Sequence, residues 1–152
     1  MDSKVFKKLV SEIFVNMGFE KKGGSFYKRN ADLIFVIGLQ KSNYSNGYFF
    51  NLGYTIKELH QNIDYPKYFE ADIRARFSFY SSTKEQTDLF VLNFENYQKD
   101  EEVYNYIQEQ IENNLSNLIE PAEKIGLKLF LQDKPLLLLQ TTIKAKNYLN
   151  LN

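Results

Sequence analysis

The beginning of the chain alternates between apolar and polar positions with the period of a helix. Within residues 3–17, apolar side chains recur at intervals of three, four and seven, with lysines and a glutamate between them. This spacing gathers the apolar side chains on one face and predicts an amphipathic helix. Ser3 is the expected N-cap and Gly18 the expected C-terminal cap. The apolar face consists of Phe6, Leu9, Val10, Ile13, Phe14 and Met17.

A strand pattern follows Gly18. The glycine pair in "FEKKGGSFYKR" predicts a tight hairpin, and two longer apolar runs follow at residues 33–39 and 48–56. The segment between these runs ends in Asn46-Gly47, which favours a turn, so the runs are predicted to be neighbouring antiparallel strands. The first run is apolar on both faces, as is expected of a strand that is covered on both sides or lies at the centre of the sheet. Gly53, like the other glycines, is interpreted as a turn residue, because no phosphate-binding glycine motif is present.

The middle of the chain predicts an ordered connection at residues 57–71 and then a long strand, "DIRARFSFY", at residues 72–80. The period of two in this strand puts four apolar side chains on one face and the polar side chains, with Tyr80, on the other. A further strand is predicted at residues 89–94. The apolar face of the long strand consists of Ile73, Ala75, Phe77 and Phe79, and the other face of Asp72, Arg74, Arg76, Ser78 and Tyr80.

From Asp100 the pattern is helical again. Three acidic residues stand at the expected N-terminus, where the helix dipole favours negative charge, and Pro121 should end or kink the helix. The tail allows two interpretations. "LKLFLQ" alternates like a strand, whereas Asp133 as a cap and Pro135 in the first turn favour a short helix that continues to about Tyr148. The apolar stripe of the acidic helix consists of Val103, Tyr106, Ile107, Ile111, Leu115, Leu118 and Ile119.

The order of helix, meander and helix predicts an α+β fold. We expect an antiparallel β-meander of about four to six strands, packed on one face by the N-terminal helix and a long C-terminal helix. The 152 residues are 43% hydrophobic, which fits a single domain spanning residues 1–152.

The amino-acid composition limits the kinds of partner and of catalytic or metal site that the chain could have. Lys and Arg together number 19, as do Asp and Glu, so any attraction to nucleic acid or to an anionic membrane would have to be local. The chain has no cysteine, which excludes disulfides and thiolate catalysis, and its one histidine, His60, lies in no metal-binding motif. No catalytic residue, metal site or cofactor is therefore predicted. The N-terminus lacks the apolar core of a signal peptide and no apolar run could span a bilayer, so we expect a soluble cytoplasmic protein.

Three motifs carry a resemblance to a known family. After an amphipathic helix, "GFEKKGGSFYKRN", "FVIGLQKSNYSNGYFFNLGY" and "ADIRARF" occur in that order. In this respect the chain resembles a bacterial family catalogued only as domain of unknown function 4304, over roughly residues 6–79 and more loosely through the acidic helix. The resemblance implies a small bacterial cytosolic domain with no established activity, and it supplies no catalytic residues.

Arginine is scarce, and its placement suggests a site. Only three of the 19 basic residues are arginines, and two of them, Arg74 and Arg76, stand two apart on one strand and so project to the same face. They could form a pocket for a carboxylate, a phosphate or an acidic partner segment. Alternatively, they could pair with Asp72 or Glu70 or stack on Tyr80.

If the three long strands are neighbours, a larger polar surface results. Gln40, Asn51, Arg74 and Arg76 would share the sheet face opposite the helices, and Lys41 and Ser42 would border it. Such a surface has no obvious base, so it is more typical of a recognition site than of a hydrolytic one.

A second basic feature lies on the predicted hairpin. Its cations are interleaved with aromatic residues, a composition that single-stranded nucleic-acid surfaces use. An edge hairpin whose lysines discourage edge-to-edge pairing is the simpler interpretation. The cations are Lys21, Lys22, Lys28 and Arg29.

These features leave three classes of function open. The leading hypothesis is a non-enzymatic binding module, immunity-like or regulatory, whose partner is another protein or a small anionic ligand. The second is an enzyme on a small anionic substrate that uses Arg74 and Arg76 with His60 or a carboxylate. The third is a single-stranded nucleic-acid binder, against which the zero net charge counts. No membrane partner is expected.

Overall fold

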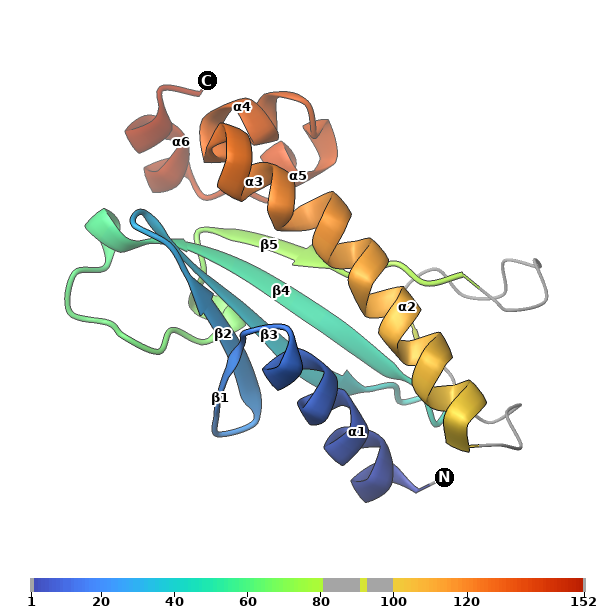
Figure 1. Ribbon diagram of the computed structural model, residues 1–152. Coiled ribbons are helices and arrows are strands. Elements are labelled where there is room, and N and C mark those ends of the chain that lie inside the picture. Colours follow the sequence, from blue (N-terminus) through green and yellow to red (C-terminus); the bar gives the residue numbers. More distant parts are fainter. Residues whose placement is uncertain (1, 81–90, 93–99, 152) are drawn as a thin grey trace.

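The computed structural model describes residues 2–80, 91–92 and 100–151. They form a five-stranded antiparallel sheet in the order β1-β2-β3-β4-β5, with the two long helices on one face (Figure 1), so the predicted α+β meander is confirmed. The strands are β1 (Glu20–Lys22), β2 (Ser25–Arg29), β3 (Leu33–Lys41), β4 (Tyr48–Ile56) and β5 (Ile73–Arg76). The helices are α1 (Ser3–Asn16), α2 (Asp100–Leu118), α3 (Glu120–Ile125), α4 (Leu127–Gln132), α5 (Pro135–Leu139) and α6 (Ile143–Leu149), with 3₁₀ turns η1 (Lys57–Leu59) and η2 (Tyr68–Glu70).

The N-cap of α1 differs from the prediction. Asp2, and not Ser3, caps the helix, because the Asp2 carboxylate accepts a hydrogen bond of 2.8 Å from the Val5 amide. Both residue types are good caps, and the pattern alone could not choose between adjacent positions. The helix still buries the predicted face against the sheet.

The main core lies between the helices and the sheet. The Phe14 ring of α1 stacks on Phe26 of β2 with centroids 4.7 Å apart. Near the start of β4, the fully buried Phe50 ring has its centroid 5.7 Å from that of Phe77 and 5.3 Å from that of Phe79. Ring pairs at these separations add to the free energy gained by burying apolar surface.

The connection between β4 and β5 covers part of the opposite face of the sheet. Tyr65 and Tyr68 pack against a small cluster formed by Tyr27, Ile34 and Val36. This second layer explains why residues 33–39 are apolar on both faces, as a doubly covered strand requires.

The prediction of a turn at Gly53 is wrong. Gly53 lies in the middle of β4, and a Cβ atom there would meet the Ala71 Cβ at 2.6 Å and the Tyr68 Cα at 3.2 Å. The absence of a side chain therefore lets the segment around η2 approach the sheet closely.

β5 is shorter than the predicted strand of residues 72–80. The alternation is as expected, with Ile73, Phe77 and Phe79 buried, but the ladder ends after Phe77, whose amide donates to the Phe50 carbonyl at 3.0 Å. The backbone then pairs with side chains of α2. Asn114 bonds both the N–H and the C=O of Ser78, at 2.9 and 2.8 Å, and Gln110 does the same for Tyr80, at 3.0 and 3.1 Å. Carboxamides thus replace a neighbouring strand.

The segment "LKLFLQ" forms the helix α4, so its interpretation as a strand is wrong. The predicted helix from Asp133 to about Tyr148 is instead two helices, α5 and α6, and Asp133 belongs to the C-terminal end of α4. The helix breaks because Thr141 forms a β-bridge with Ile73 and the Thr142 amide donates to the Asp72 carbonyl at 2.9 Å. The predicted strand at residues 89–94 lies largely outside the described residues. Leu92, which is described, forms an isolated bridge with Tyr48.

The buried hydroxyl of Tyr54 should make the folded protein less stable at alkaline pH. The Tyr54 hydroxyl is buried, donates to the Leu118 carbonyl at 2.6 Å, and has a pKa raised far above its ordinary value by that burial. Above about pH 10 the unfolded chain releases this proton and the folded chain keeps it, so the free energy of unfolding should fall as pH rises. Tyr54→Phe should reduce that fall, as measured by urea unfolding between neutral pH and about pH 11.

Three other tyrosines with raised pKa values, Tyr27, Tyr65 and Tyr148, are present in both proteins, so their contribution cancels in the comparison. Equal pH dependence in the two proteins would contradict the assignment to Tyr54.

Candidate functional site

A pocket of about 700 Å³ lies where β5 meets η2 and α5, on the sheet face opposite the long helices. We call it the arginine pocket. Its polar groups come from the sheet and its apolar groups come mainly from the turn and the short helix, which are far apart in the sequence. The lining residues are Asn51, Tyr68, Phe69, Arg74, Ala75, Arg76, Leu136, Leu137, Leu139 and Gln140.

Arg76 is held in place by neutral groups. It lies opposite Asn51 in the β4–β5 register, and its Nε donates to Asn51 Oδ1 at 2.8 Å. The Asn51 amide donates in turn to Gln40 Oε1 at 3.0 Å, and the guanidinium lies 4.3 Å from the centroid of the Phe49 ring. The structure thus brings together Gln40, Asn51 and Arg76, as the strand pattern predicted. None of these partners neutralises the positive charge.

Arg74 has no such support. Its side chain is exposed, and within the described residues its guanidinium forms no hydrogen bond, ion pair or ring contact. The carboxylate of Asp72, one of its proposed partners, is buried and engaged elsewhere. It accepts from the Ile56 amide at 2.8 Å and contacts His60 Nε2 at 2.9 Å. Arg74 therefore presents an unoccupied fork of donors to the pocket.

The other wall of the pocket is apolar and open to water. Leu136 is 78% exposed, Leu139 is 72% exposed and Phe69 is 55% exposed. A helix as short as α5 cannot bury a run of four leucines on one side, so some of them face solvent. Exposed apolar side chains gathered beside cations are typical of an interaction surface.

The remaining candidates of the predicted site lie outside this pocket. Lys41 is exposed at the end of β3, and Ser42 is buried in the following turn, where its hydroxyl accepts from the Tyr44 amide at 3.1 Å. Gln40 supports Asn51 without lining the pocket. Phe69 and the leucines of α5 were not identified from the sequence as part of this site. The run "PLLLL" was a signal for the leucines, because a short helix with four consecutive leucines cannot bury all of them.

The four cations of the hairpin do not gather on one surface. Lys28 forms an ion pair of 3.3 Å with Glu123 on the helix side of the sheet. On the other side, Lys22 lies 3.7 Å from the Tyr65 ring centroid, and Arg29 donates to the Asp64 carbonyl. Lys21 alone projects over α1.

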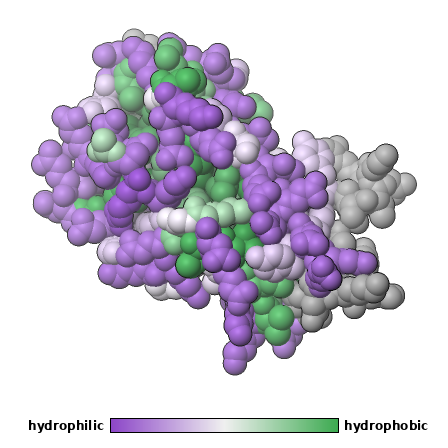
Figure 2. All heavy atoms as spheres, in the orientation of Figure 1, coloured by the Kyte–Doolittle hydropathy of each residue, from purple (hydrophilic) through white to green (hydrophobic). Residues whose placement is uncertain are grey.

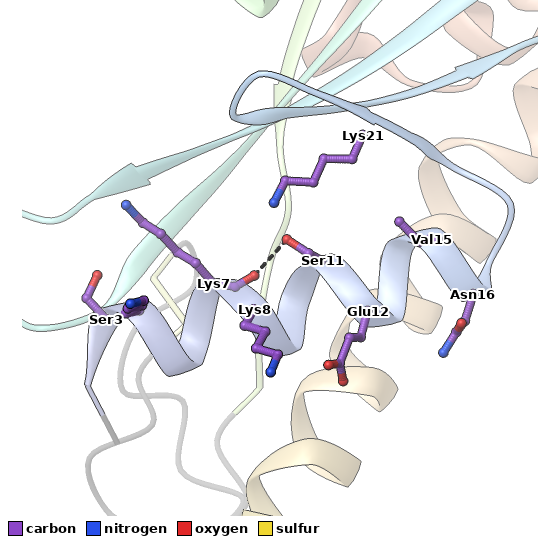
Figure 3. Close-up of a pocket in the computed structure, with 9 residues that line it drawn as sticks. Ser3, Lys7, Lys8, Ser11, Glu12, Val15, Asn16 and Lys21 are labelled. Atoms are coloured by element: carbon purple, nitrogen blue, oxygen red, sulfur yellow. Dashed lines mark hydrogen bonds between the residues drawn. The ribbon is translucent and has the colours of Figure 1, made fainter.

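Lys21 helps to line a second pocket, of about 860 Å³, beside α1 (Figure 3). There it extends toward Lys7 and Ser11, whereas Lys8 and Glu12 point away from the hairpin. The Ser11 hydroxyl donates to the Lys7 carbonyl at 2.8 Å, so it is already used within the helix. The lining residues are Ser3, Lys4, Lys7, Lys8, Ser11, Glu12, Val15, Asn16 and Lys21.

His60 lines a third and smaller pocket, of about 390 Å³. Its bond to Asp72 ties η1 to the start of β5, because the same carboxylate holds the Ile56 amide. No serine or threonine lines this pocket to serve as a nucleophile for the pair. Across the described ranges, no group of three or more metal-ligating side chains is found, and no helix has the length and apolar character needed to cross a bilayer.

Comparison with known proteins gave one informative result. Searches of curated proteins and of solved structures found no match to this chain. A family model matches residues 10–123, which include the whole sheet and α2 and therefore the arginines of the pocket, but not α5 with its leucines. This match covers most of the chain and agrees with the resemblance seen in its motifs. The chain belongs to the family described as Domain of unknown function (DUF4304).

Proposed function

We propose that the chain is a cytoplasmic bacterial recognition module, without catalytic activity, that binds a partner protein through the arginine pocket. One observation carries the proposal. The guanidinium of Arg74, which has no partner among the residues that the structure describes, lies beside the exposed apolar side chains of Phe69, Leu136 and Leu139. Such a module would be immunity-like or regulatory, because it would act by binding another protein and not by catalysing a reaction.

The charges of the pocket favour an acidic ligand. Arg74 and Arg76 lie two residues apart on one strand, so their Cα atoms are separated by about 7 Å. Arg76 is already positioned by Asn51 and the Phe49 ring, so little side-chain entropy is lost when it meets an anion. Arg74 supplies the free fork that can bind a carboxylate with two parallel hydrogen bonds.

The apolar wall favours a protein over a small anion. A small carboxylate or phosphate would use the two arginines and leave Leu136 and Leu139 in water. A polypeptide that places an acidic side chain between two large apolar side chains would use both halves of the pocket. Interfaces often concentrate their affinity at arginine and aromatic residues surrounded by apolar contacts.

Synthetic peptides test this directly. Three acetylated nonapeptides, built from Leu-Glu-Leu, Leu-Lys-Leu and Ser-Glu-Ser repeats, are titrated into the protein and followed by NMR. Only the Leu-Glu-Leu peptide should bind measurably and shift the resonances of Arg74 and Leu139. Arg74→Gln should weaken this binding about tenfold to a hundredfold, since a hydrogen bond to a charged group is worth about 1.5–3 kcal/mol.

Lys144→Gln is the matched control, because it removes an exposed cation on α6 that does not line the pocket. Arg74→Gln should melt like the parent protein, since no described residue depends on that guanidinium. If the Ser-Glu-Ser peptide binds as well as the Leu-Glu-Leu peptide, the pocket recognises charge alone and the proposal of a protein partner fails. Unchanged binding in folded Arg74→Gln would remove the pocket from consideration.

A further inference from the structure

The outward sides of α1 and α2 carry opposite charges. α1 exposes three lysines, and Lys21 of β1 joins them. Residues 100–123, which include α2, contain no lysine or arginine. The exposed charges are Lys4, Lys7, Lys8 and Lys21 on the basic side and Glu101, Glu102, Glu109 and Glu112 on the acidic side.

These charges form no ion pair with any other residue that the structure describes. The ion pairs of the described residues are Lys28–Glu123 and His60–Asp72, and neither involves this set. Even Lys8 and Glu12, one helical turn apart on the same side of α1 in Figure 3, form no ion pair. Both helices therefore present charges that a partner could pair.

The two helices lie side by side on one face of the sheet (Figure 1), and their outer surface is largely hydrophilic (Figure 2). A two-fold axis that runs between them would place α1 of one copy against α2 of the other, and the same contact would occur twice. We propose that this helical face is the interface of a homodimer, in which the lysines of each α1 pair with the glutamates of the partner's α2. An interface of this kind is self-complementary, as two-fold symmetry requires.

A second copy fits this face better than a polyanion does. A nucleic acid lying over the lysines of α1 would also meet the glutamates of the neighbouring α2 and be repelled by them. A second copy presents both signs in the required arrangement. Contact would also bury Val5 and Val15, which are 46% and 50% exposed on α1, and so adds an apolar contribution.

The dimer should be weak and sensitive to salt. A single exposed ion pair contributes about 0–1 kcal/mol, so association depends on several pairs acting together. Screening shortens the range of these charges to about 8 Å at physiological ionic strength. Sedimentation equilibrium of the unmodified protein should show a dimer at low salt that dissociates as sodium chloride is added.

Charge exchange gives the decisive experiment. Lys4→Glu/Lys8→Glu cancels the net charge of the basic set, and Glu109→Lys/Glu112→Lys cancels that of the acidic set. Either change removes the net attraction between α1 and the partner's α2, so each double variant should be monomeric. An equimolar mixture of the two should restore a dimer, because the unchanged acidic α2 of the first variant then faces the unchanged basic α1 of the second. Lys128→Glu/Lys144→Glu changes the net charge as much as the first variant but on α4 and α6, and it should dimerise like the parent protein.

Each outcome bears on the proposal. A parent protein that is monomeric at low salt up to about 1 mM, the weak end of the affinity scale, overturns it. So does a dimer that persists in either double variant, or a mixture that fails to associate although both components give the circular dichroism of the parent. Association of the mixture with a monomeric control would point to net charge and would equally refute it. None of these results depends on the arginine pocket.

Discussion

Replacing Phe50 with alanine is expected to lower the free energy of unfolding by about 3–5 kcal/mol, the usual cost of removing a buried aromatic ring. The Phe50 side chain is fully buried in the core, near the start of β4. Its ring contacts Phe6 of α1 as well as Phe77 and Phe79, so one truncation removes contacts that join β4 both to the first helix and to the segment that follows β5. Urea unfolding followed by circular dichroism measures the change.

Tyr44→Ala is the control for this variant, because the Tyr44 side chain is 99% exposed and its loss should leave the unfolding midpoint nearly unchanged. Small domains have total stabilities of about 5–15 kcal/mol, so Phe50→Ala could be partly unfolded without denaturant. Phe50→Leu keeps much of the volume and serves as the milder second variant. A cost below about 1 kcal/mol for Phe50→Ala would contradict the central position given to this ring.

The second large effect is expected from a single added methyl group. Gly53→Ala should lower the free energy of unfolding by about 1–3 kcal/mol, because the new Cβ would lie 2.6 Å from the Ala71 Cβ and 3.2 Å from the Tyr68 backbone. To relieve the contact, the segment around η2 must move off the sheet. Phe69 belongs to that segment, so binding of the Leu-Glu-Leu peptide should weaken as well.

Gly24→Ala is the matched control. An added Cβ there meets no atom within 4 Å, and the residue needs no left-handed backbone conformation. Its stability should therefore equal or slightly exceed that of the parent, since alanine restricts the unfolded chain. Equal unfolding curves for Gly53→Ala and Gly24→Ala would show that residues 68–71 do not pack closely on β4.

Local patterns predicted the centre of the fold well, because its elements depend on neighbours in the sequence. The strands at residues 33–41 and 48–56 follow from two apolar runs around one turn. The period of two puts Arg74 and Arg76 on one face of their strand, but it does not determine the register that places Asn51 opposite Arg76. The predictions were wrong where contacts with a segment distant in the sequence determine the end of a strand or helix. β5 ends early because the side chain of Asn114, 36 residues further along the chain, forms the hydrogen bonds of the Ser78 backbone that a neighbouring strand would otherwise form. The tail breaks at Thr141 because that residue pairs with Ile73.

The candidate site also has a part that could be predicted from the sequence and a part that could not. Its polar floor could be predicted, since Gln40, Asn51 and Arg76 lie on neighbouring strands of one meander. Its apolar wall could not, because the sequence does not show that α5 returns to β5 or that Phe69 is left exposed. Nor does the sequence show that Arg74 and Arg76 differ. Arg76 is held by the Asn51 amide and the Phe49 ring, whereas Arg74 has no partner in the part of the chain that the structure describes.

The arginine pocket takes its floor and its wall from two separate stretches of chain. The arginines belong to the sheet that residues 10–123 share with the family, whereas Leu136 and Leu139 belong to a short helix beyond that match. Substitutions in the tail can therefore alter the shape and bulk of the wall without disturbing the residues that fold the sheet. Under the proposed function, this division would allow the choice of partner to change through the tail while the two arginines stay in place on the sheet.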